Sequence, residues 1–181
     1  MLKHLVLSGL AVFAFAAFPI SAYGDDSENK SLTKTHAQIA ENFSGITHLT
    51  PEQIIDKENV LFFDVREEKE FNVSHIKGAT YVDPSIKAEA FMTEFEQDWT
   101  GKTIVFYCSV GQRSSLLAAR VQTALKAKGA SEVVNLEKGI FGWHNQSMPL
   151  TNENGQTQKV HPYDAFWKRK VNRKDLTSYK P

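Results

Sequence analysis

Two apolar runs of strand length, "NVLFFDV" at residues 59–65, which ends in a charge, and "TIVFYC" at residues 103–108, constrain the fold of this chain most strongly. A strand that is apolar at successive positions must be buried on both faces, which is typical of parallel sheets covered by helices. Similar shorter runs at residues 78–83 and 132–136, and a short apolar pattern at residues 45–49, predict three further strands.

The segments between these runs have the apolar spacing of amphipathic helices. Residues 85–98 and 114–129 predict two helices, and Gly129 is placed to end the second one. A capping-box motif at residues 50–53 predicts another helix, and "GIFGWHNQ" at residues 139–146 predicts a last short one. Strands alternating with helices indicate an α/β fold: an open parallel β-sheet with helices on both faces, in a single domain.

The two ends of the chain differ from this pattern. Residues 1–24 combine a basic start, an apolar run shorter than the roughly 20 residues that cross a bilayer, and small residues before an acidic segment. They predict a secretory signal peptide, cleaved after Gly24 or Ala22, and hence a periplasmic protein if the source is Gram-negative. Polar residues 25–44 lack a sustained apolar period and predict a linker, which leaves residues 45–150 as the domain.

Residues 151–181 are expected to form a basic and aromatic C-terminal tail. Seven Lys or Arg residues lie between positions 159 and 180, with aromatic residues among them. Two interpretations are open: a solvated tail with one aromatic anchor on the domain, or a docking element at residues 159–181 for a protein partner or an anionic membrane. The whole chain has 21 Lys plus Arg and 21 Asp plus Glu, and this balance argues against nucleic-acid binding, which needs a basic surplus.

Cys108 is the only cysteine, and it ends one of the two apolar runs. An unpaired cysteine in an exported protein indicates a reactive thiol or an intermolecular bridge, although a small buried hydrophobe is the simpler alternative. Ligands of open α/β sheets bind at the carboxyl ends of the strands, where Cys108 and Asp64 should both lie. With one cysteine and six scattered histidines, no metal site is expected.

The loop after Cys108 has the composition of an anion cradle. It consists of Ser109, Val110, Gly111, Gln112 and Arg113. Gly111 permits backbone angles that point several N–H groups at one centre, and these amides, the following helix and Arg113 would stabilise a thiolate. Lowering a thiol pKa by two units takes roughly 2.7 kcal/mol, which one or two charged hydrogen bonds of about 1.5–3 kcal/mol supply.

Three motifs in this order resemble the rhodanese-like sulfurtransferases, over about residues 45–150. "DVREEKEFNVSHIKGATYVDP" is similar to the first family signature, "CSVGQRSS" to the active-site pattern of single-domain members, and "NLEKGIFGWHNQSMP" to the closing segment. Lys138 replaces a glycine that is common in the closing segment, and Ser147 replaces one that often precedes the proline. These departures affect turn geometry more than catalysis.

The resemblance implies a two-step sulfur transfer through a persulfide on Cys108. A donor such as thiosulfate would load the sulfur, and cyanide or a thiol would accept it, with residues 109–113 binding substrate and no metal or organic cofactor involved. Asp64 and Arg66 either help to shape the pocket or form a strand-end ion pair that positions the next turn. His75 is expected to be structural, and Trp143 to lie in the core.

Three points remain open at this stage. Ser114 and Ser115 could orient the thiolate or cap the helix. Cysteine phosphatases and arsenate reductases also use a loop from cysteine to arginine, but theirs is one residue longer; the four residues between Cys108 and Arg113 favour a single sulfur atom over a phosphate. A non-enzymatic sulfur carrier or binding module is the other alternative.

Overall fold

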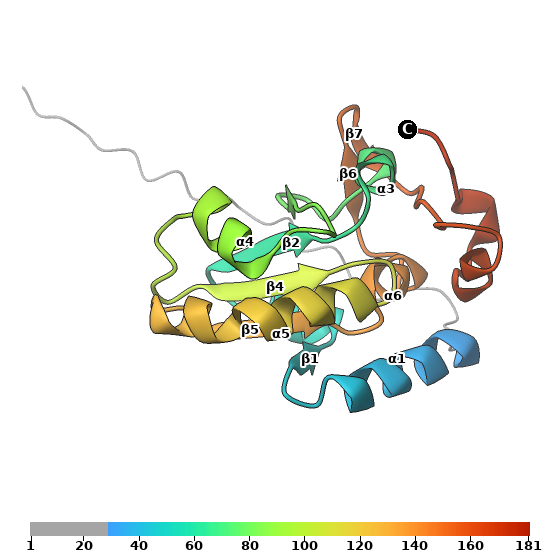
Figure 1. Cartoon of the computed structure of the whole chain (residues 1–181). Coiled ribbons are helices and arrows are strands. Elements are labelled where there is room, and N and C mark those ends of the chain that lie inside the picture. The colour runs from blue at the N-terminus through green and yellow to red at the C-terminus, as the bar shows by residue number, and fades with distance from the viewer. Residues whose placement is uncertain (1–28) are drawn as a thin grey trace, which may run out of the picture.

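The computed structural model describes residues 29–181, and the predicted signal peptide lies outside them. Five parallel strands form the central sheet in the order β1-β5-β4-β2-β3 (Figure 1). The strands are β1 (Thr47–Leu49), β2 (Val60–Asp64), β3 (Thr80–Tyr81), β4 (Thr103–Tyr107) and β5 (Glu132–Leu136). The helices are α1 (Lys30–Asn42), α2 (Pro51–Ile55), α3 (Glu68–Val73), α4 (Ala88–Glu94), α5 (Gln112–Ala127) and α6 (Gly139–Asn145).

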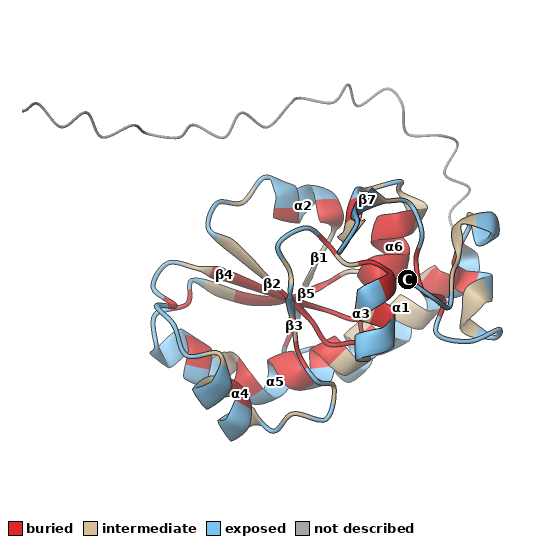
Figure 2. Ribbon diagram, turned by 90° about the horizontal axis from the view of Figure 1, so that it is seen from above, coloured by how far each residue is buried: buried red, intermediate tan, exposed pale blue. Residues whose placement is uncertain are grey.

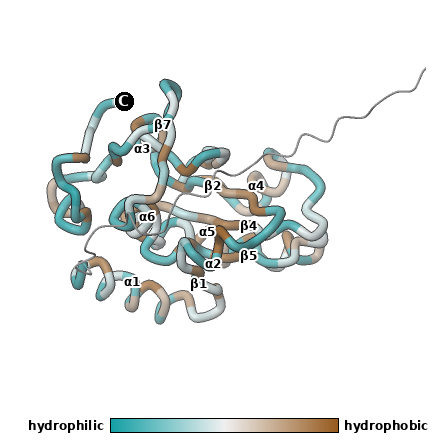
Figure 3. Tube along the Cα trace, turned by 180° about the vertical axis from the view of Figure 1, so that it is seen from behind, coloured by the Kyte–Doolittle hydropathy of each residue, from teal (hydrophilic) through white to brown (hydrophobic). Residues whose placement is uncertain are grey.

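Helices cover both faces of this sheet, as the apolar runs predict. All five residues of β4 are buried: Ile104 and Phe106 pack with α4 and α5, whereas Val105 and Tyr107 pack with α2 and α6. Figure 2 shows the two helical layers on opposite sides of the strands, and Figure 3 shows the apolar strands β2 and β4 in the interior. The predicted α/β fold class is confirmed.

Local signals place several helix ends correctly. Thr50 Oγ1 accepts a hydrogen bond from the Gln53 amide, and the Gln53 side chain accepts one from the Thr50 amide, which completes the predicted capping box of α2. Gly129 follows the end of α5 with a φ of +96°, a conformation that favours glycine. No helix within residues 29–181 is long and apolar enough to span a bilayer.

The predicted linker at residues 25–44 is wrong over most of its length. Lys30 to Asn42 form α1, which begins at the N-cap Asn29, whose Oδ1 accepts a hydrogen bond from the Leu32 amide. Only Leu32 and Ile39 of this helix are buried, so its apolar face is too sparse to stand out in the sequence. The helix nevertheless contributes both side chains to the core layer that also holds α6.

The solvated-tail interpretation of residues 151–181 is also wrong. A hairpin of β6 (Leu150–Asn152) and β7 (Gly155–Thr157) is followed by two 3-10 helices, η2 (Trp167–Lys170) and η3 (Lys174–Leu176). Val160 and Val171 have no exposed surface and belong to the same core layer as α1. Residues 159–181, called here the C-terminal segment, are therefore part of the folded unit, and η2 contacts α1.

Candidate active site

Cys108 directly follows β4 at the carboxyl edge of the sheet. Asp64, the last residue of β2, pairs with Tyr107 in the register of the sheet, so both strand ends lie at the same edge, as predicted. Cys108 is 1% exposed, and it lines a cleft at this edge. The position is the one at which open parallel sheets bind ligands.

The loop after the thiol is shorter than predicted, because α5 begins at Gln112 and not near Ser114. Cys108 to Gly111 form the turn, called here the thiol loop, and Gln112 and Arg113 lie in the first turn of a 16-residue helix. The Gly111 amide donates a hydrogen bond to Cys108 Sγ at 3.2 Å. The positive N-terminal end of α5 is thus directed at the sulfur, and this favours a thiolate.

Gly111 is required at this turn for two reasons. Its φ is +102°, in the left-handed region that favours glycine. A Cβ at this position would lie 2.8 Å from Nδ2 of Asn135, a buried side chain at the end of β5. Any other residue would therefore displace both the turn and the amide that contacts Cys108.

The pKa of Cys108 lies below its ordinary value. Burial of the thiol acts against ionisation, but the charge of Arg113, interactions with the backbone and side chain of Ser114, and one with the Val110 backbone together outweigh it. A buried cysteine without these partners would show the opposite shift. The environment therefore activates Cys108, which the interpretation as an inert buried hydrophobe does not explain.

Arg113 is held by a buried carboxylate, Glu70 of α3. Arg113 Nη1 donates to Glu70 Oε2 at 2.9 Å and Nη2 to Oε1 at 3.2 Å, while Ser109 Oγ donates to Oε1 at 2.8 Å. Burial opposes the ionisation of Glu70, but its hydrogen bonds and charge interaction with Arg113 lower its pKa. The carboxylate thus fixes the guanidinium that stabilises the thiolate, and it joins Ser109 of the thiol loop to α3.

Asp64 and Arg66 form a second, separate ion pair. Arg66 Nη2 donates to Asp64 Oδ2 and to the Ser74 carbonyl oxygen, both at 2.6 Å, and neither side chain of the pair is exposed. Neither residue lines the cleft. The structure therefore shows a strand-end ion pair that holds the turn between β2 and the end of α3, which is one of the two predicted roles.

Ser114 lies beside the thiol and does not cap α5, because the N-cap position is Gly111. Ser114 Oγ donates to Asn135 Oδ1 at 2.6 Å, and the hydroxyl also takes part in the interactions that lower the pKa of Cys108. The Ser115 hydroxyl is buried and has no hydrogen-bond partner in the described chain. Of the two serines, Ser114 is the one that contributes to the site.

The two turns that carry the family departures, one at each end of α6, have an unusual backbone. Lys138 has a φ of +60° and Ser147 a φ of +58°, so both substitute for glycine in left-handed conformations. Next to Lys138, Gly139 packs so tightly that a Cβ there would overlap the Cys108 carbonyl oxygen. The Ile140 amide donates to that oxygen at 2.9 Å and thereby fixes the start of the thiol loop.

The remaining named residues have structural roles. His75 Nδ1 lies 3.1 Å from the Phe71 carbonyl oxygen, and its ring stacks on Phe71 with centroids 3.9 Å apart. Trp143 is 4% exposed and donates to the Pro149 carbonyl oxygen. Both agree with the sequence-based expectation of a structural histidine and a core tryptophan.

A cleft of about 820 Å³ lies above the thiol loop. Its walls come from the two segments whose structure the sequence analysis missed: α1, with Ile39 and Asn42 among the lining residues, and the C-terminal segment, with Tyr163, Phe166 and Lys170. In Figure 1 both walls lie beyond the carboxyl end of β4. The thiol loop and the first turn of α5 form the floor between them.

Sequence reasoning found the floor of this site but not Glu70 or the walls. Glu70 carried a signal, because it lies in the first family motif, yet nothing local linked it to Arg113. Tyr163 is the clearest omission. Its ring centroid lies 5.4 Å from Arg113 Cζ, so the ring contacts the guanidinium, and no local motif predicts this contact. Its φ of +67°, unusual for an aromatic residue, cannot be read from the sequence.

The parallel sheet and the cysteine loop define a class of α/β proteins with a cysteine at a helix N-terminus. Within this class, residues 51–146 match the Rhodanese-like domain family. The chain therefore belongs to the rhodanese-like domain family. The match ends before the C-terminal segment and begins after α1, so both walls of the cleft lie outside it.

Similar proteins include the probable adenylyltransferase/sulfurtransferase MoeZ of Mycobacterium tuberculosis, which is 32% identical over 106 residues. This alignment covers 56% of the chain but 25% of MoeZ, so the chain spans a minor part of that relative. Among solved structures, a thiosulfate sulfurtransferase from Pseudomonas aeruginosa has 16% identity and a TM-score of 0.49, covering 81% of this chain and 27% of that one. A protein of unknown function from Rhodopseudomonas palustris, described as a possible tyrosine phosphatase, has 23% identity and a TM-score of 0.43, covering 70% and 96%.

Proposed function

We propose that this protein is a sulfurtransferase that carries a sulfane sulfur as a persulfide on Cys108. The observation that carries the proposal is the thiol loop itself: Cys108 Sγ accepts a hydrogen bond from the Gly111 amide at the N-terminus of α5. The lowered pKa of Cys108 supports a nucleophilic thiolate at this position. Family membership supports the same chemistry.

The first step loads the sulfur. The Cys108 thiolate attacks the outer sulfur of a donor such as thiosulfate, a new S–S bond forms, and the old S–S bond breaks with its electron pair leaving on sulfite. The backbone amides of the loop stabilise the resulting persulfide anion, as they do the thiolate. In the second step an acceptor, cyanide or a thiolate, attacks the outer sulfur of the persulfide, and the bonding pair returns to Cys108.

The engagement of Arg113 supports sulfur transfer over phosphate chemistry. Two of its nitrogens donate to Glu70, so the guanidinium is already paired with a carboxylate. A phosphatase needs its arginine to donate two hydrogen bonds to the oxyanion of the substrate. With four residues between Cys108 and Arg113 and this prior pairing, the loop suits a single sulfur atom.

Intact mass spectrometry tests the proposal directly. Wild-type protein treated with thiosulfate should gain the mass of one sulfur atom and lose it on addition of cyanide, whereas Cys108→Ser should do neither. A sulfur that is gained but never released to cyanide or to thiols would identify a carrier instead of an enzyme. No gain from thiosulfate or from a polysulfide donor, together with hydrolysis of an aryl phosphate, would overturn the proposal in favour of a phosphatase.

We also propose that the protein is exported to the periplasm. The proposal rests on the pattern of residues 1–24, which lie outside the described residues. Fractionation of expressing cells and N-terminal sequencing of the mature protein test it. A mature chain that starts at Asp25 or Tyr23 supports export, and retention of Met1 in the cytosolic fraction contradicts it.

A further inference from the structure

Asn135 of β5 is a buried polar residue that the proposed sulfur transfer does not use. Its side chain has no exposed surface, and it does not line the cleft. Burial of a carboxamide is costly unless its N–H and C=O groups find hydrogen-bond partners. The partners of this side chain therefore show what it holds in place.

The orientation of the Asn135 carboxamide follows from its neighbours. Nδ2 lies 3.2 Å from the carbonyl oxygen of Leu136, which can only accept a hydrogen bond, so the nitrogen must face that oxygen. Oδ1 then faces Ser114, whose Oγ donates to it at 2.6 Å. Nδ2 also lies 3.2 Å from Nδ1 of His48, which receives its second hydrogen. The carboxamide thus makes three hydrogen bonds in a single orientation.

Two of the residues beside this carboxamide belong to the N-terminus of α5. Ser114 lies in the first turn of the helix, and Gly111 is its N-cap. Asn135 Nδ2 lies 2.8 Å from the point that a Cβ of Gly111 would occupy, so the carboxamide packs directly against this glycine. The Gly111 amide in turn donates to Cys108 Sγ. Asn135 therefore reaches the sulfur through one intervening residue.

The sheet gives this contact its geometric value. Asn135 pairs with Phe106 in the register of β5 and β4, and Cys108 follows Phe106 by two positions. The thiol and the carboxamide thus extend from neighbouring strands of one sheet, whereas Gly111 has no side chain that could anchor the start of α5. A hydrogen bond weakens steeply when its donor moves out of line, so the position of this helix end relative to the sheet decides how well its amide serves the sulfur.

His48 of the edge strand β1 completes the set of bonds. Its Nδ1 accepts from Asn135 only while that nitrogen carries no proton. Burial, with the charge of His36 adding to it, lowers the pKa of His48 from 6.5 to about 4, so the ring is neutral at pH 7. His36 of α1 lies edge-on to this ring, with centroids 5.0 Å apart. Both histidines precede residues 51–146, so the support of Asn135 comes from outside the matched domain.

We propose that Asn135 is a positioning residue, whose carboxamide holds the N-terminus of α5 where the Gly111 amide stabilises a thiolate at Cys108. It acts through Gly111 and Ser114, and His48 supports it by accepting its second N–H. This role rests on the proposed function in one respect, because Cys108 is the nucleophile of that reaction. A side chain that merely fills space in the core would have no influence on the ionisation of the thiol.

The pH profile of Cys108 alkylation by iodoacetamide distinguishes these two roles in the full mature chain. Asn135→Leu keeps a similar size and removes all three hydrogen bonds. We expect the midpoint of the profile to rise by about one pH unit, the shift that corresponds to loss of about one hydrogen bond to a charged group. Val134→Ala is the matched control, because it removes a buried side chain from the same strand and leaves the carboxamide in place. It should destabilise the protein and leave the midpoint unchanged.

His48 provides a second test, which remains available if Asn135→Leu does not fold, because His48 is only half-buried and lies in an edge strand. His48→Leu removes the acceptor and should raise the midpoint by roughly half a unit, since Asn135 keeps two of its three bonds. His48→Asn places a carbonyl oxygen close to the position of Nδ1 and should restore the midpoint of the wild type.

An unmoved midpoint in Asn135→Leu, an equal rise in Val134→Ala, or a rise in His48→Leu that His48→Asn does not reverse would overturn the inference. Alkylation needs no sulfur donor, so the two possible failures are distinct. The expected shifts in a protein that gains no sulfur from thiosulfate or polysulfide would support the role of Asn135 and refute the proposed function. Normal sulfur loading with an unmoved midpoint in Asn135→Leu would do the reverse.

Discussion

The floor and the walls of the cleft are held in place by different kinds of interaction. The floor is fixed by the parallel sheet, by the hydrogen bond from Ile140 to Cys108, and by the pairing of Arg113 with Glu70. The walls are docked onto the core through a few apolar side chains and joined by side-chain hydrogen bonds such as those of Lys170. Elements with few buried contacts open more easily than a sheet. We therefore expect substitutions to disturb the selectivity set by the walls more readily than the chemistry of the floor.

The largest expected effect lies in the framework of the floor, at the Asp64–Arg66 pair. Arg66→Met leaves Asp64 buried with no cation beside it, and loss of one partner of a buried ion pair costs about 3–5 kcal/mol. Urea denaturation measures the free energy of unfolding. Lys69→Met is the control, because its pair with Glu67 is solvent-exposed and should contribute little to stability. Equal losses in the two variants would contradict the distinction.

The next effect concerns the attachment of the C-terminal segment and depends on pH. His144 is fully buried, and its Nε2 lies 2.9 Å from the carbonyl oxygen of Gln158. Gln158 directly precedes the C-terminal segment. Burial, with the charge of Arg173 adding to it, lowers the pKa of His144 from 6.5 to about 4. Between pH 6.5 and 4 the unfolded chain binds a proton that the folded chain does not, so the free energy of unfolding falls as the pH falls through this window.

This single group should contribute a loss on the order of 3 kcal/mol between pH 7 and pH 4. His144→Gln should reduce the pH dependence of the unfolding free energy by about that amount, while the other titrating groups contribute equally in both proteins. Urea denaturation at the two pH values measures the difference. An identical pH dependence in wild type and variant would show that His144 does not act in this way.

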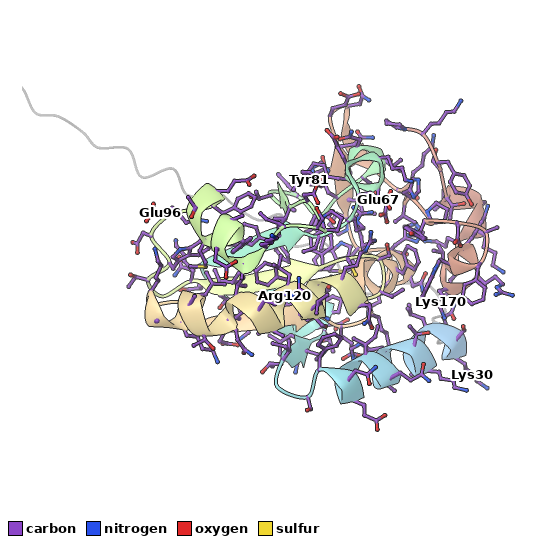
Figure 4. The ribbon with its side chains drawn as sticks, viewed as in Figure 1. Lys30, Glu67, Tyr81, Glu96, Arg120 and Lys170 are labelled. Atoms are coloured by element: carbon purple, nitrogen blue, oxygen red, sulfur yellow. The ribbon has the colours of Figure 1, made fainter. Side chains whose placement is uncertain are left out.

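A smaller effect on stability, with a marked effect on reactivity, is expected at Arg113. Arg113→Gln removes the charge that most favours the thiolate, so the pKa of Cys108 should rise. It also leaves Glu70 without its guanidinium partner, which costs about 1–3 kcal/mol. The pH profile of Cys108 alkylation by iodoacetamide measures the first change and urea denaturation the second. Arg120→Gln, on the exposed side of the same helix (Figure 4), should leave the profile in place; a shift there would implicate net charge alone.

The smallest effects come from the two helix N-caps, and they separate the regions most clearly. Thr50 caps α2 beside the sheet and Asn29 caps α1 in the wall, so replacement of either by Ala removes a capping bond that contributes about 1 kcal/mol. Asn29→Ala also removes the bonds from Nδ2 to the Arg169 carbonyl oxygen and to Asn172 Oδ1. Amide hydrogen exchange should then differ between them. Asn29→Ala should speed exchange in α1 and η2 while the strands stay protected, and Thr50→Ala should lower protection across the domain. The same pattern in both variants would remove the distinction between floor and wall.

The sequence predicted what is encoded over short distances. The apolar runs of β2 and β4 identify the sheet because burial on both faces leaves no polar position. The thiol loop was found because Cys108 and Gly111 are only three positions apart, yet the start of α5 was misplaced because its N-cap is a glycine without a capping side chain. Glu70 and Arg113 are 43 positions apart, and no local pattern links them.

The walls escaped prediction for a related reason. α1 buries Leu32 and Ile39 only, and this spacing of seven positions gives too weak an apolar period. The C-terminal segment owes its place to single residues such as Val160 and Val171, each surrounded by polar neighbours. The hydrogen bonds that join this segment to α1, from Asn29 to Arg169 and from Lys170 to Ser31, span more than a hundred positions, so only the tertiary structure brings the two walls together.

The position of the walls along the chain also sets the order in which the protein is completed during synthesis. The floor is specified by residues 51–146, but the second wall includes Lys170, whose bonds to Ser31 and Thr35 cannot form until almost the whole described chain has emerged. A chain that lacks residues 159–181 would lose one wall of the cleft that Cys108 lines. The cleft around Cys108 is therefore completed only after its floor has been specified.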